Sequence, residues 1–344
     1  MAAELLLAAA AALSLAVVFA PPRVRRASLL TRGLVGLAGM AAIAIAPTLD
    51  LILLILLVLA VLQAGLVSHR DFAARVRAPV LAIALLALGL AFERIEGPPV
   101  LLRFGAVGLV AGLVAAIGLL PYLHEFDPEE STVASPIPWI AFVGPVLAVA
   151  VLARARQLVP AYAGDALGAM LIGLGLLNVL WGTVAAWRTE TDAAAWRYSF
   201  LSDWGLVLCG FGLAIADGQG AALILLLSIV LGRLPLYLWS RQAVRDKTPT
   251  DRPINLLVAA ALAGSAPFAG FAARVMLLRG ATQIYWPLAV VLAAAMLLWL
   301  PASLRLGRSM GLPRGRQAIG VAIVLAISVF LGLYPQPLLV LAGQ

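Results

Sequence analysis

The sequence predicts an all-α polytopic membrane protein with about 12 transmembrane helices and with both termini on the outer side of the membrane. Composition is the first reason, since 63% of the 344 residues are hydrophobic, 12% are charged and the mean hydropathy is +1.05. Soluble globular domains contain roughly 25% charged residues. The second reason is that mostly apolar runs of about 20 residues, enough to cross a bilayer core, recur along the whole chain. The third is the placement of the basic residues.

The apolar runs give the order of the expected helices. The third and fourth depend on LILLILLVLAVLQAGLV (51–67) and VLAIALLALGLAF (80–92), which contain almost no polar residue. The first run resembles a secretion signal, but an acidic residue precedes it and basic residues follow it, so we expect an uncleaved helix. The expected spans are 3–20, 30–47, 49–67, 78–95, 102–123, 136–153, 160–187, 198–215, 219–239, 253–279, 283–305 and 315–342.

Basic residues concentrate in the loops that this topology places in the cytoplasm, as Lys and Arg do in membrane proteins. Seventeen of the 24 basic residues lie in those loops. Only five belong to the other side, namely Arg94, Arg103, Arg154, Arg156 and Arg279. This asymmetry explains the net charge of +8, so we expect no nucleic-acid partner. We expect a multi-pass protein of the bacterial cytoplasmic (inner) membrane, surrounded by the lipid bilayer.

Residues that hold cofactors or metals are scarce. The single Cys209 lies inside an apolar run, which excludes disulfides and argues against thiolate-held haem or clusters. Two histidines, His69 and His124, are too few for a haem pair buried between helices. No nucleotide-binding loop, CxxC pair or hydrolase elbow is present. We therefore expect no catalytic residue, cofactor or metal, and a role as a transporter, a channel or a membrane subunit of a larger assembly.

Charged residues inside the apolar runs are the candidate functional residues, because a charge in lipid costs several kcal/mol. Arg233 lies beside Gly232 and Pro235, and Arg274 follows a segment interrupted by Gly264, Pro267 and Gly270. Broken helices at these two segments would place polar groups inside a bundle. Asp165 and Asp203 lie near the starts of expected helices, where the helix dipole alone favours a carboxylate. For the two arginines, snorkelling to an interface or a structural ion pair is the alternative.

Four segments resemble the antiporter-like membrane subunits of respiratory complex I, Mrp-type cation/proton antiporters and membrane-bound hydrogenases. LAGSAPFAGFAAR (262–274) is similar to the family pattern L-x-G-x-P-P-x-x-G-F-x-x-K, and RLPLYLW (233–239) to K-A-x-L-F-L. TETDAAAWRYSFLSDWGLVLCG (189–210) and LGLYPQPLL (331–339) resemble a cytoplasmic loop with its following helix and the closing segment of the family. The resemblance implies both termini outside and two broken helices.

Upstream the resemblance is weaker, which divides the chain into N-terminal helices (1–97) and an antiporter-like bundle (98–344). PYLHEFDPEESTVASPIPW (121–139) stands where the family has a conserved loop, so His124 and Glu125 join Asp203, Asp165, Arg233 and Arg274 as candidates for an intramembrane polar axis. The family usually has fourteen helices, for which the chain is too short, so the resemblance implies that two are missing near the N-terminus.

The departures from the family bear on function. Proton-moving members use a buried Glu and Lys pair followed by Lys and His residues. Here the Glu position falls near Val58 and the paired Lys near Ala116, and neither 51–67 nor 104–120 contains a Glu or Lys. The two surviving basic sites are Arg233 and Arg274, and arginine is a poor proton relay because it stays charged.

The sequence thus predicts a shortened, degenerate antiporter-like subunit, structural rather than catalytic, in a complex I-like or hydrogenase-like assembly of membrane subunits. An active proton or cation translocator is the second reading. A stand-alone transporter of a small solute is the third.

Overall fold

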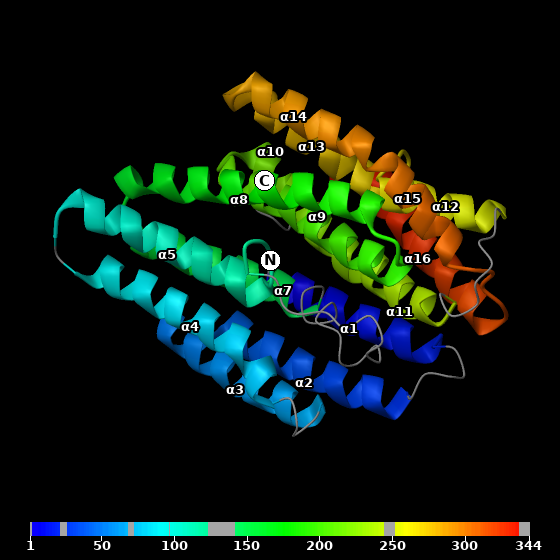
Figure 1. The fold of residues 1–344 in the computed structure, drawn as a ribbon, viewed down its shortest axis with the longest axis horizontal. Coiled ribbons are helices and arrows are strands. Elements are labelled where there is room, and N and C mark those ends of the chain that lie inside the picture. Colours follow the sequence, from blue (N-terminus) through cyan, green and yellow to red (C-terminus); the bar gives the residue numbers. More distant parts are fainter. Residues whose placement is uncertain are drawn as a thin grey trace. The chain divides into compact units, whose positions relative to one another are not determined.

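A computed structural model describes residues 2–20, 26–67, 72–95, 97–122, 142–243 and 252–336, and these ranges consist of helices and short connections (Figure 1). A helix satisfies its backbone hydrogen bonds internally, which lipid requires. The described helices are α1 (Ala2–Val18), α2 (Arg26–Ile45), α3 (Leu49–Val67), α4 (Phe72–Arg94), α5 (Pro99–Ile117), α7 (Gly144–Leu158), α8 (Ala161–Arg188), α9 (Asp192–Gly212), α10 (Ala216–Leu227), the π-helix η1 (Ser228–Arg233), α11 (Leu234–Ala243), α12 (Pro253–Ala263), α13 (Ala269–Ile284), α14 (Trp286–Leu298), α15 (Leu300–Ser309) and α16 (Arg316–Leu333).

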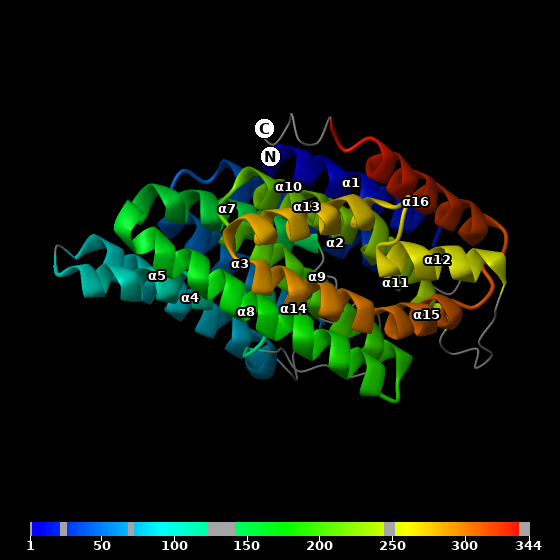
Figure 2. The same ribbon diagram turned by 90° about the horizontal axis from the view of Figure 1, so that it is seen from above.

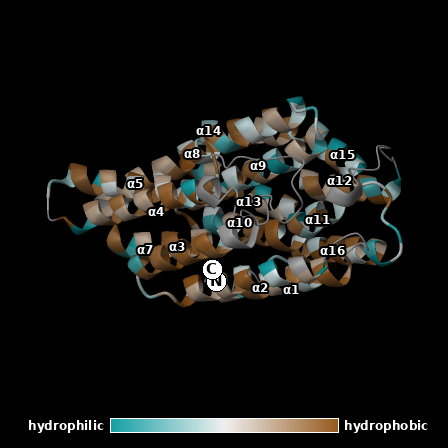
Figure 3. Cartoon of the chain, turned by 60° about the horizontal axis from the view of Figure 1, so that its bottom comes forward, coloured by the Kyte–Doolittle hydropathy of each residue, from teal (hydrophilic) through white to brown (hydrophobic). Residues whose placement is uncertain are grey.

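Membrane-spanning character is evident in the described helices. Figure 3 shows hydrophobic residues along most of their length. Five stretches are long and apolar enough to cross a membrane, namely Pro99–Ile117, Ala163–Arg188, Ala216–Ser240, Trp286–Ser309 and Arg316–Leu333, and four shorter apolar helices accompany them. The chain is therefore a multi-pass membrane protein. The count of about 12 spans and the side on which the termini lie stay predictions.

Two compact units make up the chain. The first unit contains residues 1–7 and 27–171, and the second contains residues 8–26 and 172–344, so that the boundary falls inside α8. The predicted division at residue 97 follows the family resemblance rather than packing, and it stays a prediction.

In the first unit, glycines allow α4 and α5 to pack closely. A Cβ built on Gly89 would lie 2.6 Å from the backbone nitrogen of Leu109, and one built on Gly112 would lie 2.6 Å from that of Leu86. Small residues bring the backbones of membrane helices together in this way. Elsewhere in the unit, Arg154 of α7 donates a hydrogen bond of 2.9 Å to the carbonyl of Ala46, just after α2.

In the second unit, α9 and α10 form the interior. Every residue from Ser199 to Gly212 is buried. A Cβ built on Gly175 of α8 would lie 2.7 Å from the carbonyl oxygen of Gly205, so α8 and α9 also meet at glycines. α10 packs against both α9 and α13, as Figure 2 shows for α10 and α13. This packing places the middle of α9 away from the surface of its unit.

The expected break at Gly232–Pro235 is a change of helix type rather than an interruption. The chain stays helical from Ala216 to Ser240, but Ser228–Arg233 form a π-helix in which the N–H of Leu234 bonds to the carbonyl of Ile229, five residues earlier. Proline removes one hydrogen bond and clashes with the preceding turn of an α-helix. A wider π turn absorbs both effects, so Pro235 does not end the helix.

The expected single span over 253–279 is two helices. α12 ends at Ala263, and Gly264 has a φ of 65°. α13 begins at Ala269, after Pro267 and before Gly270. The predicted interruption at Gly264–Gly270 coincides with this gap. A left-handed glycine ends a helix readily because no Cβ opposes that conformation.

Candidate functional site: a buried arginine–aspartate cluster

Asp203 and Arg233 form a buried ion pair in the second unit. Asp203 lies in the middle of α9, and Arg233 is the last residue of η1. The Nε atom of Arg233 contacts the Oδ2 atom of Asp203, and the two side chains are only 6% and 8% exposed. Asp203 therefore does not lie near the start of a helix, which was the alternative interpretation of its position in the sequence. The π turn places Arg233 against α9.

Arg233 also reaches the C-terminal end of α12. Its Nη2 atom donates a hydrogen bond of 3.2 Å to the carbonyl of Leu262, which accepts a second one of 2.9 Å from the indole Nε1 of Trp299. The guanidinium carbon lies 5.4 Å from the centre of the Trp299 ring. The last carbonyls of a helix have no partner within it and carry partial negative charge. The broken helix thus supplies a carbonyl that a cation can satisfy inside the bundle.

Arg274 of α13 lies at the same helix end. A Cβ built on Gly264 would lie 2.6 Å from the guanidinium carbon of Arg274, so the guanidinium group covers this glycine directly. Arg274 is 8% exposed, and the helix end that it covers is also the one that Arg233 reaches through the carbonyl of Leu262. Neither arginine snorkels to the surface of its unit. The break after Ala263 therefore brings two guanidinium groups and one carboxylate together.

The cluster carries more positive than negative charge. Its members are two arginines and one aspartate, and α12 adds only the partial charge of its C-terminal end, equivalent to roughly half an elementary charge. The Nη1 atom of Arg233 and the Nε atom of Arg274 are buried and have no hydrogen-bond partner among the described residues. Both are N–H donors, so the described part of the site has fewer acceptors than donors.

Chemically, the cluster is suited to holding charge and poorly suited to exchanging protons. Arginine keeps its proton in proteins, and two of the three charged residues of the cluster are arginines. The described residues contain no group of three or more His, Cys, Asp or Glu side chains that could hold a metal ion.

The remaining candidates for the predicted polar axis are Asp165, His124 and Glu125. Asp165 belongs to the first unit, near the start of α8, and it is exposed there. The first turn of α8 contains no acidic residue, so both readings of Asp165 stay predictions. His124 and Glu125 lie outside the described residues.

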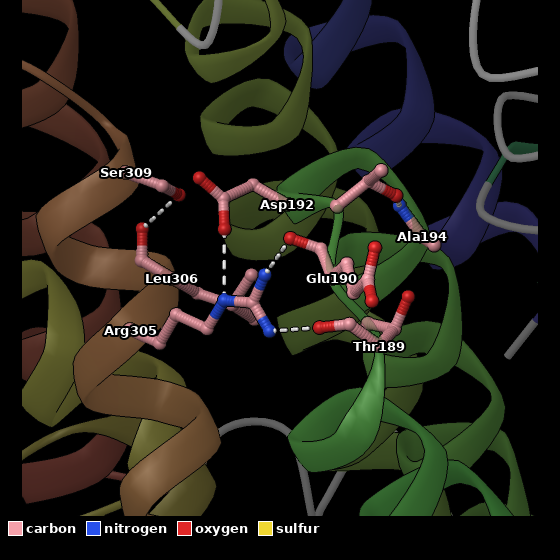
Figure 4. A network of polar contacts seen from close by, with 8 residues as sticks. Thr189, Glu190, Asp192, Ala194, Arg305, Leu306 and Ser309 are labelled. Atoms are coloured by element: carbon pink, nitrogen blue, oxygen red, sulfur yellow. Dashed lines mark hydrogen bonds and ion pairs between the residues drawn. The ribbon is translucent and has the colours of Figure 1, made fainter. Parts of the chain in front are cut away.

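A second polar contact, which sequence reasoning missed, is made by Arg305 of α15 (Figure 4). Its Nε contacts the Asp192 carboxylate at 2.8 Å, its Nη2 donates to the carbonyl of Glu190 at 2.7 Å, and its Nη1 donates to the carbonyl of Thr189. Thr189 and Glu190 belong to the connection between α8 and α9, and Asp192 is the first residue of α9, the helix that carries Asp203. In the sequence, Arg305 was only one of the basic residues assigned to a cytoplasmic loop. Its acceptors lie 113 to 116 residues earlier, so no local pattern pointed to them.

Comparison with known proteins gives relatives that are named as subunits of NADH-quinone oxidoreductase. NADH-quinone oxidoreductase subunit N of Ectopseudomonas mendocina is 26% identical over 278 residues, which are 71% of this chain and 56% of that protein. Subunit M of Mycobacterium tuberculosis is 24% identical over 73% of this chain and 50% of that protein. No protein-family model matches the sequence.

Solved structures agree in fold. A chain of the Mrp complex from Dietzia sp. matches with a TM-score of 0.79 and 14% identity over 98% of this chain and 43% of that chain. A chain of respiratory complex I from Thermus thermophilus matches with a TM-score of 0.66 and 15% identity over 90% of this chain and 80% of that chain.

The chain resembles the antiporter-like membrane subunits in sequence and in fold. The predicted family resemblance is therefore confirmed. The chain spans about half the length of the curated relatives that it matches, 56% and 50% for the two described above. Its antiporter-like fold includes the broken helix and the π-helix that build the cluster.

Proposed function

We propose that this antiporter-like chain is a membrane-arm subunit of a complex I-like or hydrogenase-like respiratory assembly, in which it holds a fixed charge and does not itself carry protons. Its partners would be the neighbouring membrane subunits of that assembly in a bacterial cytoplasmic membrane. Residues 98–344 would form the antiporter-like bundle, and residues 1–97 would form the helices of weaker likeness. The relatives that are named as NADH-quinone oxidoreductase subunits support an assembly of this class.

One observation carries the non-conducting role: arginine occupies both basic positions of the cluster. A relay needs groups that release and regain a proton, and arginine does not release its proton at accessible pH. Asp203, the one titratable member, is paired with Arg233. In the first unit, α3 and α5 contain no Glu, Lys or His side chain that could extend a relay.

A fixed buried charge can still act on its surroundings. At an effective dielectric near 20, two unit charges 4 Å apart interact by about 4 kcal/mol, and the interaction falls with distance. Interactions of this size would hold the helices around the cluster together. The subunit would then extend the membrane arm without carrying protons or changing its neighbour's proton path.

An active translocator is the second candidate, and the buried carboxyl group of Asp203 favours it. In that case Asp203 would change protonation state during turnover, and its replacement by Asn would stop ion movement. In the fixed-charge role the same replacement removes a counter-charge and weakens packing.

Two measurements test the proposal. Affinity purification of the tagged chain from its native membrane should recover other membrane subunits, whereas a stand-alone transporter would be recovered alone. Proteoliposomes that contain the full chain should then show no uncoupler-sensitive proton uptake. Robust uptake by the chain alone would replace the fixed-charge role with the translocator.

A further inference from the structure

The interior of the second unit has an excess of hydrogen-bond donors. Among its described residues, the buried side-chain polar atoms without a partner include the Nη1 of Arg233, the Nε of Arg274 and the indole Nε1 atoms of Trp196 and Trp239, and every one is an N–H donor. Buried polar groups in folded proteins nearly always have partners. The described part of this unit therefore has unpaired donors rather than unpaired acceptors.

Two of these donors belong to the arginine–aspartate cluster, where charge is also unbalanced. Arg233 contacts the carboxylate of Asp203 and Arg274 covers Gly264 at the end of α12, so two guanidinium groups and one carboxylate meet there among the described residues, and the helix end contributes only partial negative charge. A buried charge that lacks a counter-charge is strongly destabilising. A water molecule would accept hydrogen bonds from the donors and leave the charge uncompensated. An anion would do both.

Burial limits what that anion can be. Asp203, Arg233 and Arg274 are 5%, 5% and 8% exposed within the chain itself. A side chain of another subunit or a lipid headgroup would have to displace buried helices to reach them. A small ion needs far less space. Because the ion must leave its hydration shell to enter, a monovalent ion that dehydrates easily is favoured over a divalent one.

From these observations we infer that the Arg233–Arg274–Asp203 cluster binds one small monovalent anion, of the class of chloride, bromide or nitrate. The inference rests on the proposed fixed-charge role, since a permanently charged arginine pair needs a permanent counter-charge. The anion would accept N–H bonds from the Nη1 of Arg233 and the Nε of Arg274. It would lock the broken end of α12 to η1 and α13.

Bromide locates the site directly. The full chain, purified with the subunits that accompany it, is crystallised in sodium bromide, and anomalous scattering is measured at the bromine edge. We expect one peak within hydrogen-bonding distance of Arg233 Nη1 and Arg274 Nε. No peak there, with peaks only beside exposed arginines, would mean an adventitious ion only and would overturn the inference.

Thermal unfolding gives a second test that does not need crystals. The midpoint of the wild-type assembly should rise by a few degrees when sodium gluconate is replaced by chloride or nitrate at the same ionic strength, since a ligand that binds only the native state stabilises it. Arg274→Met leaves one arginine and one aspartate, so the shift should disappear. Asp203→Asn leaves two unpaired arginines, so the shift should grow.

Arg94→Met is the matched control, because it removes an exposed arginine of the first unit that is paired with Asp50. It should keep the wild-type shift. An equal shift in Arg94→Met, Arg274→Met and the wild type would show a general salt effect and overturn the inference. If Arg274→Met does not assemble, the wild-type bromide map alone decides.

Failure of the inference is distinguishable from failure of the proposed function. No bromide in the cluster, together with unchanged proton stoichiometry in cluster variants, would overturn the anion site and leave the fixed-charge role. Bromide in the cluster, together with loss of proton transfer in Asp203→Asn, would overturn the fixed-charge role and leave the anion site.

Discussion

The guanidinium group of Arg274 fills the space that a side chain on Gly264 would occupy, with the guanidinium carbon 2.6 Å from the position of the absent Cβ. Gly264 also has a φ of 65°, which side chains disfavour. One glycine therefore serves two purposes: it ends α12, and it lets Arg274 cover the helix end. The polar cluster of this subunit depends on both.

Gly264→Ala should destabilise the subunit through both effects. Left-handed backbone alone costs a residue with a Cβ about 1–2 kcal/mol, and displacement of the buried Arg274 adds to this. Unfolding in mixed micelles measures the loss. Gly173→Ala in α8 is the control, because a Cβ there meets nothing within 4 Å and the change should be neutral or stabilising. In the double variant Gly264→Ala/Arg274→Ala, the stability lost through the clash with Arg274 should be recovered. The cost of the left-handed backbone should remain. Full additivity of the two substitutions would contradict the contact.

The Asp203–Arg233 pair should behave as a buried ion pair. Removing either partner alone, as Asp203→Asn or Arg233→Met, should cost about 3–5 kcal/mol of unfolding free energy, because the remaining charge loses its partner. The double variant should cost less than the sum of the two. The Asp50–Arg94 pair in the first unit is the control, since its side chains are 53% and 57% exposed and it should contribute at most about 1 kcal/mol. Equal costs at the two pairs would show that the Asp203 site is open to solvent.

Arg305 should hold the α8–α9 connection through the fork geometry of its guanidinium group. Arg305→Lys keeps the charge but cannot make three separate contacts to Asp192, Glu190 and Thr189. Backbone amides of 189–194 should then exchange hydrogen faster. Arg279→Lys is the control, because the side chain of Arg279 is 69% exposed and its Nε forms an ion pair with the carboxylate of Asp217. Unchanged exchange in Arg305→Lys would mean that charge alone holds the connection.

The charge asymmetry of the loops predicts that Lys247 is cytoplasmic and that both termini are outside. Reporter fusions after Lys247, which lies outside the described residues, and at the C-terminus would test this. A cytoplasmic reporter signal at Gln344 would reverse the topology.

Sequence reasoning found the charged members of the cluster because arginine and aspartate inside apolar runs are conspicuous. It also placed a break at Gly264–Gly270, since Gly264, Pro267 and Gly270 follow one another closely. It could not find the acceptor carbonyl of Leu262 or the indole of Trp299, because neither differs from any other apolar position in the sequence.

Two further features were beyond the sequence for a physical reason. Pro235 predicted an interrupted helix, but the preceding π turn absorbed the proline, and a change of hydrogen-bond register leaves no compositional trace. Arg305 has partners more than 100 residues away, so no local pattern links them. Pairing across such distances is decided by helix packing.

Proton stoichiometry of the reconstituted parent assembly tests the central claim most directly. Protons moved per electron are measured for the wild type and for Arg274→Met, alongside the yield of intact assembly. Because arginine holds charge and does not relay protons, the ratio should be the same in both, while the variant should assemble less well. A ratio that falls in intact Arg274→Met assemblies would contradict the fixed-charge role, and protons would then have to pass through this subunit.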